Sequence, residues 1–193
     1  MGIIYDDENH TYHLKKKRLG GNSEVLAASG IRQSNNFVSD HDLYVGTASH
    51  KAVELHIKGT LDKPNLDTLL IPRVEAYIKF EKATGFVPVA TEEIVYSEVL
   101  GIATRIDILG YFPNKTHGII EMKSGGLDPT VGIQTAIQQL CLSMGTDKTR
   151  RFGLSIAKNG KPNLIEFTDP GDFKVAMAGI TIYNWLRNIG RIK

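Results

Sequence analysis

Residues 101–123, GIATRIDILGYFPNKTHGIIEMK, contain two mainly apolar runs that are rich in β-branched residues, IATRIDIL and GIIEMK. This pattern predicts two strands joined by a turn at Pro113. Asp107 interrupts the first strand, and Glu121 and Lys123 interrupt the second. Since successive side chains of a strand point to opposite faces, Glu121 and Lys123 share one face. If the two strands pair as a hairpin, Asp107 lies beside Glu121.

Two carboxylates that are buried side by side need a cation, because burying unpaired charge is costly. A hard divalent ion such as Mg²⁺ prefers an oxygen site of this kind, completed by waters and by the phosphate oxygens of a substrate. Lys123 would then lie beside the phosphate. The tripeptide Glu121 to Lys123 alone favours a salt bridge on a surface hairpin over a metal site, so the rest of the chain has to decide between the two interpretations.

The hydrophobic pattern assigns the other elements as well. A small hairpin is expected over residues 1–21, and a short helix follows to Ala28. Apolar residues at a spacing of three and four predict longer helices, and alternating or β-branched runs predict more strands. The helices are expected at 43–58, 71–84, 129–144 and 172–189, and the strands at 87–100, 150–157 and 162–167.

The last helix carries a set of large apolar side chains at the spacing of a core-facing stripe. We expect them to pack inside the protein, so that the tryptophan belongs to the core and offers no platform for stacking bases. The set is Phe173, Met177, Ile180, Trp185 and Ile189.

Polar side chains lie among apolar ones on two of the helices. His50 and Glu54 are four residues apart and share a face; this spacing alone favours an ordinary core histidine over a metal ligand. Gln134 and Gln138 share a face of a later helix. A buried amide needs hydrogen-bond partners, and it suits a phosphate, a water or a base edge.

One more acidic side chain is a candidate for the same site. The strand before the hairpin contains Glu92 and Glu93 in succession. If that strand is half buried, one of the two has to face inward. A solvated acidic turn explains the pair equally well.

Composition and charge restrict the function classes. The net charge of +2 is too small to indicate nucleic-acid binding, so a basic surface has to be local, with residues 14–19 (LKKKRL) and 148–151 (KTRR) as candidates. Cys141 is the only cysteine, which excludes an intramolecular disulfide and a four-cysteine zinc or iron–sulfur site. No apolar run is long enough for a membrane span and no signal peptide is evident, so we expect a cytoplasmic protein of a bacterium or an infected host cell.

Four short motifs, in this order and on these elements, resemble the PD-(D/E)xK nuclease superfamily, and within it the RecB-like exonucleases with their small phage-encoded members. The resemblance spans nearly the whole chain. The family's helical motif is usually written Q-x-x-x-Y, and Gln138 stands at the Tyr position here, which leaves the contact of that aromatic ring with DNA open. The matching positions are Gly46, Thr47, His50 and Glu54; Gly101 to Asp107; Glu121 and Lys123; and Gln134.

The resemblance implies an α/β fold with an αβββαβ core, in which helices flank a central mixed sheet and a small hairpin precedes it. It implies a single nuclease domain over residues 1–193. The N-terminal hairpin would be 1–21, the catalytic core 43–157, and the C-terminal hairpin and helix 158–193.

The resemblance also implies a DNA exonuclease that depends on Mg²⁺ or Mn²⁺ and has no iron–sulfur cluster. Asp107, Glu121 and Lys123 would be the catalytic residues, and Lys123 would orient the attacking water and help deprotonate it. The expected metal ligands are His50, Asp107, Glu121 and the backbone carbonyl of Met122. Substrate-positioning groups would be Glu54, Ser124, Gln134 and Gln138.

The expected substrate is DNA that is single-stranded or has free ends, in recombination, repair or degradation. A recombination partner such as an annealing or single-strand-binding protein fits this role, whereas cleavage polarity and oligomeric state stay open. Two other functions remain: a structure-specific DNA endonuclease of the same fold, and a non-catalytic DNA- or protein-binding module. The complete Asp, Glu, Lys and His set argues against the module, because an inert scaffold has no need to hold carboxylates together.

Overall fold

The fold is described for residues 2–32, 39–142 and 149–192 of a computed structural model. Its strands are β1 (Ile3–Asp6), β2 (Thr11–Leu14), β3 (Lys17–Gly21), β4 (Val87–Ser97), β5 (Ile102–Tyr111), β6 (His117–Lys123), β7 (Arg150–Ile156) and β8 (Pro162–Glu166). Its helices are α1 (Asn22–Ala28), α2 (Asp40–Ile57), α3 (Ile71–Thr84), α4 (Thr130–Cys141) and α5 (Gly171–Asn188).

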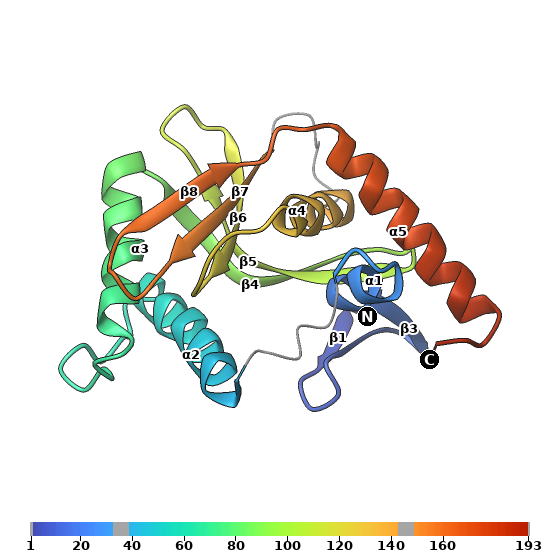
Figure 1. The fold of residues 1–193 in the computed structure, drawn as a ribbon, viewed down its shortest axis with the longest axis horizontal. Helices are drawn as coiled ribbons and strands as arrows, with labels where there is room; N and C mark the ends of the chain where they lie inside the picture. Colours follow the sequence, from blue (N-terminus) through green and yellow to red (C-terminus); the bar gives the residue numbers. More distant parts are fainter. Residues whose placement is uncertain (1, 33–38, 143–148, 193) are drawn as a thin grey trace.

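All eight strands form one mixed sheet in the order β1-β2-β3-β5-β6-β7-β8, with β4 paired to β5. The hairpin β5–β6 predicted at residues 101–123 is present, with Ile108 opposite Ile120. β6 and β7 run parallel and are connected through α4. Figure 1 shows α4 lying across the sheet, with α3 at one end of the molecule and α5 at the other. The predicted αβββαβ order and the mixed sheet flanked by helices are confirmed.

Two apolar clusters hold the helices on the sheet. One joins α2 and α3 to β5, β6 and β7 and includes Val53, Tyr77, Phe80, Ile120 and Met122. The other joins α1, α4 and α5 to the start of β5 and includes Leu26, Ile102, Ile137, Cys141 and Tyr183. Met122 belongs to the first cluster, so its neighbours in the strand, Glu121 and Lys123, face the other side, as the alternation predicts.

The helix boundaries differ from the predicted ones in places where a cap decides them. α2 begins at Asp40 rather than at residue 43, because the side chain of Ser39 accepts a hydrogen bond from the backbone N–H of Asp42. α3, in contrast, spans Ile71–Thr84 as predicted, and Gly85 at its C-cap takes the left-handed conformation that stops a helix. The last residues of the predicted helix 129–144 lie outside the described residues.

The apolar stripe predicted on the last helix is wrong in part. Ile180 is buried, but Met177, Trp185 and Ile189 are 39%, 59% and 49% exposed. The buried face of α5 is instead made by Ala176, Gly179, Ile180 and Tyr183. Small residues let α5 approach α1 closely, and a pattern read from large apolar residues alone misses them.

Within the described residues, no helix is long and apolar enough to cross a membrane.

Candidate active site

The site lies at a gap in the sheet. On one edge of β5, Ile102 and Ala103 pair with β3, whereas Ile108 to Tyr111 pair with β6. Of the four residues between them, 104–106 pair with β4 alone, on the opposite edge, and Asp107 lies between the paired residues Ile106 and Ile108. Because β3 and β6 diverge, side chains of α4 and α2 reach this edge of β5 in place of another strand: Gln138 donates to the carbonyl of Arg105, and His50 lies against Asp107. The residue pattern predicted the hairpin, but nothing in the sequence indicated this gap.

Asp107 is the last residue of the gap and is 9% exposed. Its Oδ2 accepts a hydrogen bond of 2.7 Å from the backbone N–H of Met122, which replaces the ladder bond lost as β6 diverges. The same oxygen lies 3.6 Å from Nδ1 of His50, which α2 brings over the end of β5. His50, predicted as a metal ligand by resemblance and as a core histidine by spacing, thus lies against Asp107.

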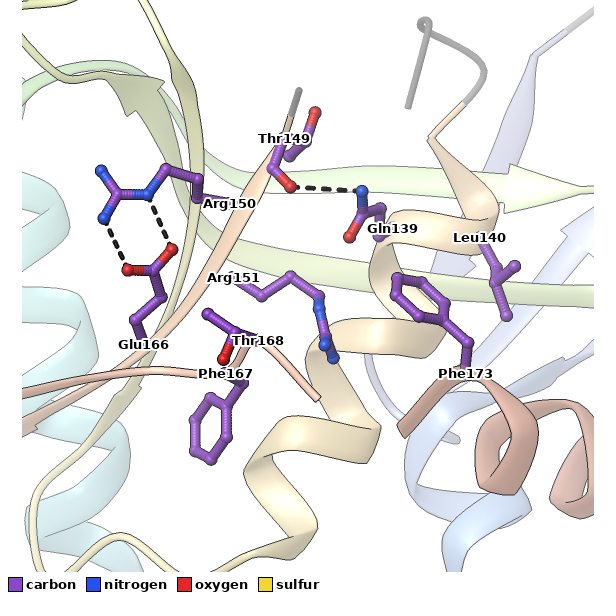
Figure 2. Close-up of a pocket in the computed structure, with 9 residues that line it drawn as sticks. All are labelled: Gln139, Leu140, Thr149, Arg150, Arg151, Glu166, Phe167, Thr168 and Phe173. Atoms are coloured by element: carbon purple, nitrogen blue, oxygen red, sulfur yellow. Dashed lines mark hydrogen bonds and ion pairs between the residues drawn. The ribbon is translucent and has the colours of Figure 1, made fainter. Parts of the chain in front are cut away.

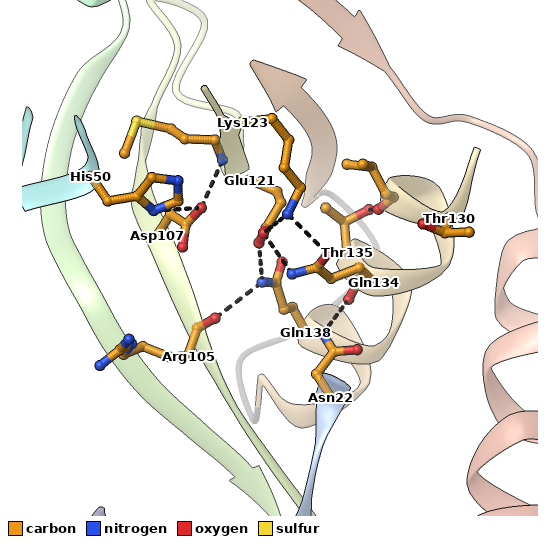
Figure 3. A network of polar contacts seen from close by, with 12 residues as sticks. Asn22, His50, Arg105, Asp107, Glu121, Lys123, Thr130, Gln134, Thr135 and Gln138 are labelled. Carbon is orange, nitrogen blue, oxygen red and sulfur yellow. Dashed lines mark hydrogen bonds and ion pairs between the residues drawn. The ribbon is translucent and has the colours of Figure 1, made fainter. Parts of the chain in front are cut away.

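Glu121 lies beside Asp107 on β6 and is 3% exposed. Its Oε1 accepts hydrogen bonds from Nζ of Lys123 at 2.6 Å and from Nε2 of Gln134 at 2.5 Å. Its Oε2 accepts one from Nε2 of Gln138 at 2.7 Å, and this amide also donates to the carbonyl of Arg105 at 3.1 Å. Figure 3 shows how the two glutamines reach from α4 toward Glu121 at the gap. Gln138, at the position where the family has Tyr, is therefore a carboxylate partner.

Glu92 completes the acidic group. Its φ of +54° is left-handed, at a position between Thr91, which pairs with Ile108, and Glu93, which pairs with Ile106. Glu92 is thereby turned inward, and the exposed Glu93 is not. Its carboxylate binds Nε of Arg105 at 2.6 Å. The sequence indicated that one of the two glutamates faces inward but could not say which.

Three of these side chains could hold a metal ion. His50, Glu92 and Asp107 each offer one ligand atom, and these atoms lie within 4.8 Å of one another. A divalent cation prefers such carboxylate donors. Glu121, expected among the ligands, is not in this closest group, and lysine and amide donors bind both of its oxygens. A carboxylate has about four acceptor sites, so Glu121 retains capacity at Oε2.

The charges of the site are balanced by protons and cations of the chain itself. Burial lowers the pKa of His50, but the carboxylates of Asp107 and Glu121 outweigh it and raise this pKa to about 9. Burial raises the pKa of Asp107, and the charge of His50 more than offsets this and lowers it. His50 is therefore protonated at neutral pH and supplies the positive charge that a metal would bring to the same carboxylates.

Glu121 and Lys123 respond in opposite ways to the same surroundings. Burial and the neighbouring Asp107 raise the pKa of Glu121. Burial lowers the pKa of Lys123, but the charges of Glu121 and Asp107 prevail and raise it. Lys123 thus carries its proton, and it donates to Gln134 at 3.3 Å as well as to Glu121.

These residues open into a cavity of about 800 Å³ between α2, the N-terminal hairpin and the end of β6. Ser124 and Glu54, both predicted to position a substrate, line it. Glu54 is held by Lys51 at 2.8 Å and by Lys58 at 2.5 Å, and hydrogen bonds from these lysines lower its pKa. The two lysines thus balance the negative charge of Glu54, which lines the same cavity as His50, Glu92 and Asp107 but is not one of these three possible ligands.

The basic segment at 148–151 offers no open cationic surface within its described residues. Arg150 forms two hydrogen bonds with Glu166, at 2.6 and 2.7 Å. Arg151 is 3% exposed, donates to the carbonyl of Gly132 and lies over the ring of Phe173. Figure 2 shows both arginines at a separate cavity, lined also by Glu166 and Phe173; its volume is about 650 Å³. Lys148 lies outside the described residues.

Comparisons with known proteins place the fold. No protein-family model and no curated protein matches the sequence. The structure is similar to that of a protein from Eubacterium rectale that is provisionally named an exonuclease, with a TM-score of 0.55 and 14% sequence identity, over 98% of this chain and 86% of that one. LHK-Exo, an alkaline exonuclease from Laribacter hongkongensis, was solved with dAMP; it aligns with 91% of this chain and 95% of its own, at 15% identity and a TM-score of 0.43. The chain thus shares the fold of the Eubacterium rectale protein, with the central mixed sheet flanked by helices that its motifs predicted.

Proposed function

We propose that the protein is a metal-dependent DNA exonuclease, which hydrolyses phosphodiester bonds from DNA ends. One observation carries the proposal: a group able to hold a metal, His50, Glu92 and Asp107, shares one open cavity with Lys123, which is paired to the buried Glu121. The fold, shared with a protein provisionally named an exonuclease, supports it.

The donor set fits Mg²⁺ or Mn²⁺, since carboxylate oxygens dominate it. Asp107 and Glu92 would ligate the ion together with His50, and Oε2 of Glu121 has capacity to join them. When bound, such an ion supplies positive charge against the carboxylates and against the charge that develops on the phosphate. His50 would release its proton, because a ligand nitrogen must be neutral.

Lys123 would act first as a hydrogen-bond donor to the phosphate or to the attacking water, since its raised pKa keeps the proton on Nζ. It could accept a proton only after its pKa falls, which positive charge nearby favours. Gln134 and Gln138 would position Glu121, because their amides donate to its two oxygens. We further propose a role in DNA recombination, repair or degradation, with a protein that anneals or coats single strands as partner.

A cleavage assay on end-labelled single- and double-stranded DNA tests the proposal. We expect shortening from an end with Mg²⁺ or Mn²⁺, none with EDTA, and none in Asp107→Asn or Lys123→Ala. Lys79→Ala is the matched control, since Lys79 is 56% exposed and does not line this cavity. Nicking of closed circular DNA would instead make the protein an endonuclease. Undiminished cleavage by Asp107→Asn, or none by the wild type with either metal, would overturn the proposal.

A further inference from the structure

The cavity of the candidate site continues into a second one beneath the N-terminal hairpin. This second cavity has a volume of about 380 Å³ and lies between the hairpin β1–β2, α1 and β5. Tyr5, His10, Arg105 and Asp107 line both cavities, so the two meet at the metal group. Only the first cavity is used by the function proposed above.

One wall of the second cavity is aromatic. Tyr5 and Tyr12 are opposite each other on β1 and β2, with ring centroids 4.9 Å apart. The hydroxyl of Tyr5 lies 2.9 Å from Nδ1 of His10, a residue of the hairpin turn. On the side of β5, the guanidinium carbon of Arg105 lies 5.1 Å from the centroid of the Tyr5 ring. Tyr5 is therefore fixed on several sides while still lining both cavities.

The opposite wall is polar but carries no unpaired charge. Glu24 binds Arg18 at 2.6 Å and the backbone N–H of Gly21 at 2.8 Å. Asn22 is 6% exposed and uses Nδ2 to bind the carbonyl of Gln134, and its Oδ1 has no hydrogen-bond partner among the described residues. A ligand that meets these walls needs a flat π-system and neutral hydrogen-bonding groups.

A nucleobase has both properties. We propose that this second cavity, called the base cavity from here on, holds the base of the nucleotide next to the scissile phosphate, stacked on Tyr5. The inference rests on the proposed function, because the phosphate is taken to lie at Asp107 and Lys123. Bases stack on aromatic rings without regard to sequence, so the base cavity would bind any of the four bases. A base inside a duplex could enter only after unstacking, and the ligand is therefore a single-stranded or frayed end.

Kinetics on short oligonucleotides test the role of Tyr5. Each substrate carries either thymidine or an abasic residue at its 5′ or its 3′ end. Stacking on one aromatic ring changes affinity by about 5- to 150-fold. In the wild type we expect the KM to rise by about tenfold when the base at the recognised end is removed, with kcat unchanged. Tyr5→Ala should show the high KM for both substrates, whereas Tyr5→Phe should still discriminate.

Two controls separate stacking from damage to the fold. Tyr96→Ala removes a tyrosine that is 38% exposed on β4 and lines neither cavity, and it should behave as wild type. Tyr5→Leu keeps an apolar side chain against Tyr12 but has no ring, and it should behave as Tyr5→Ala while melting near the wild-type temperature. A wild type that cuts both substrates alike, or a Tyr5→Leu that still discriminates, overturns the base cavity and leaves the nuclease untouched.

A binding measurement covers the case without cleavage. An oligonucleotide with 2-aminopurine at one end loses fluorescence when that base stacks on an aromatic ring. Quenching by the wild type but not by Tyr5→Leu, in a protein that cuts no DNA, would support the base cavity and refute the proposed nuclease. Absence of both quenching and cleavage would refute both proposals.

Discussion

Replacement of Lys123 by methionine tests how the buried charges of the site are balanced. The Nζ of Lys123 lies 2.6 Å from Oε1 of Glu121, whose side chain is 3% exposed, against 27% for that of Lys123. Removal of one partner of a buried ion pair costs about 3–5 kcal/mol. Two features reduce this cost: Lys123 is partly exposed, and two glutamine amides still bind Glu121. We therefore expect a loss of about 2–3 kcal/mol at pH 8, at or just below the low end of that range.

The loss should depend on pH in a definite direction. Burial and Asp107 already raise the pKa of Glu121, and Lys123 is the first cause that lowers it. Without Lys123 the pKa of Glu121 in the folded protein rises further above its value in the unfolded chain. A carboxyl of this kind binds its proton more tightly in the folded protein, so stability is present at low pH and is lost as the pH rises through the folded-state pKa. The variant should therefore approach the wild type near pH 5.

Urea denaturation without added metal, at pH 5 and pH 8, measures both effects. Lys51→Met is the control, since its exposed pair with Glu54 is worth less than about 1 kcal/mol. The double variant Lys123→Met/Glu121→Gln, which removes both charges, should recover most of the stability. A loss that is equal at the two pH values, or a double variant as unstable as the single one, would refute this account of the site.

Three further predictions concern the metal, the thiol and the packing of α5. Because His50 is protonated below about pH 9, Mg²⁺ or Mn²⁺ should bind more tightly as the pH rises from 7 to 9, and binding should release a proton. Calorimetry in buffers of different ionisation enthalpy detects this proton. Metal binding that does not depend on pH would contradict the prediction. Burial raises the pKa of Cys141 to about 12, so iodoacetamide at pH 8 should leave the native thiol unmodified and react with it in urea, and rapid labelling of the folded protein would count against this. A Cβ at Gly20 would lie 2.2 Å from the buried ring of Tyr183, so the free energy of unfolding of Gly20→Ala, measured by urea denaturation, should fall by about 1–3 kcal/mol. Gly2→Ala is the control, because no atom lies within 4 Å of a Cβ at that position. Equal stability of the two variants would refute the prediction.

Much of the fold could be predicted because its signals are local. The alternation in residues 101–123 is enough to place Asp107 next to Glu121, since it fixes both the strand faces and the hairpin. Likewise, α4 keeps Gln134 and Gln138 on one face through their spacing of four. The sequence thus named the residues that the fold assembles around the carboxylates. Their catalytic roles stay predictions.

What could not be predicted depends on long-range geometry. Glu92 faces inward because of a left-handed φ, a conformation that no residue pattern on β4 signals. Ala176 and Gly179 determine which face of α5 is buried, because these small residues let α5 approach α1 closely; their hydrophobicity does not decide it. Trp185, the largest apolar residue of α5, is consequently left outside.

The gap in the sheet explains why the site forms where it does. β3 reaches only Ile102 and Ala103 of β5, since Gly20 and Gly21 end the strand and α1 begins at once. β6 pairs from Ile108 onward and then follows β7. The backbone groups that a continuous strand ladder would pair are bound by side chains instead. Gln138 donates to the carbonyl of Arg105, and Asp107 accepts from the N–H of Met122. Each of these side chains also holds or faces a charge of the site, so the contacts that close the sheet are the contacts that position Asp107 and Glu121. Stability and the geometry of the carboxylates are therefore coupled, and Gln138→Leu should weaken both together.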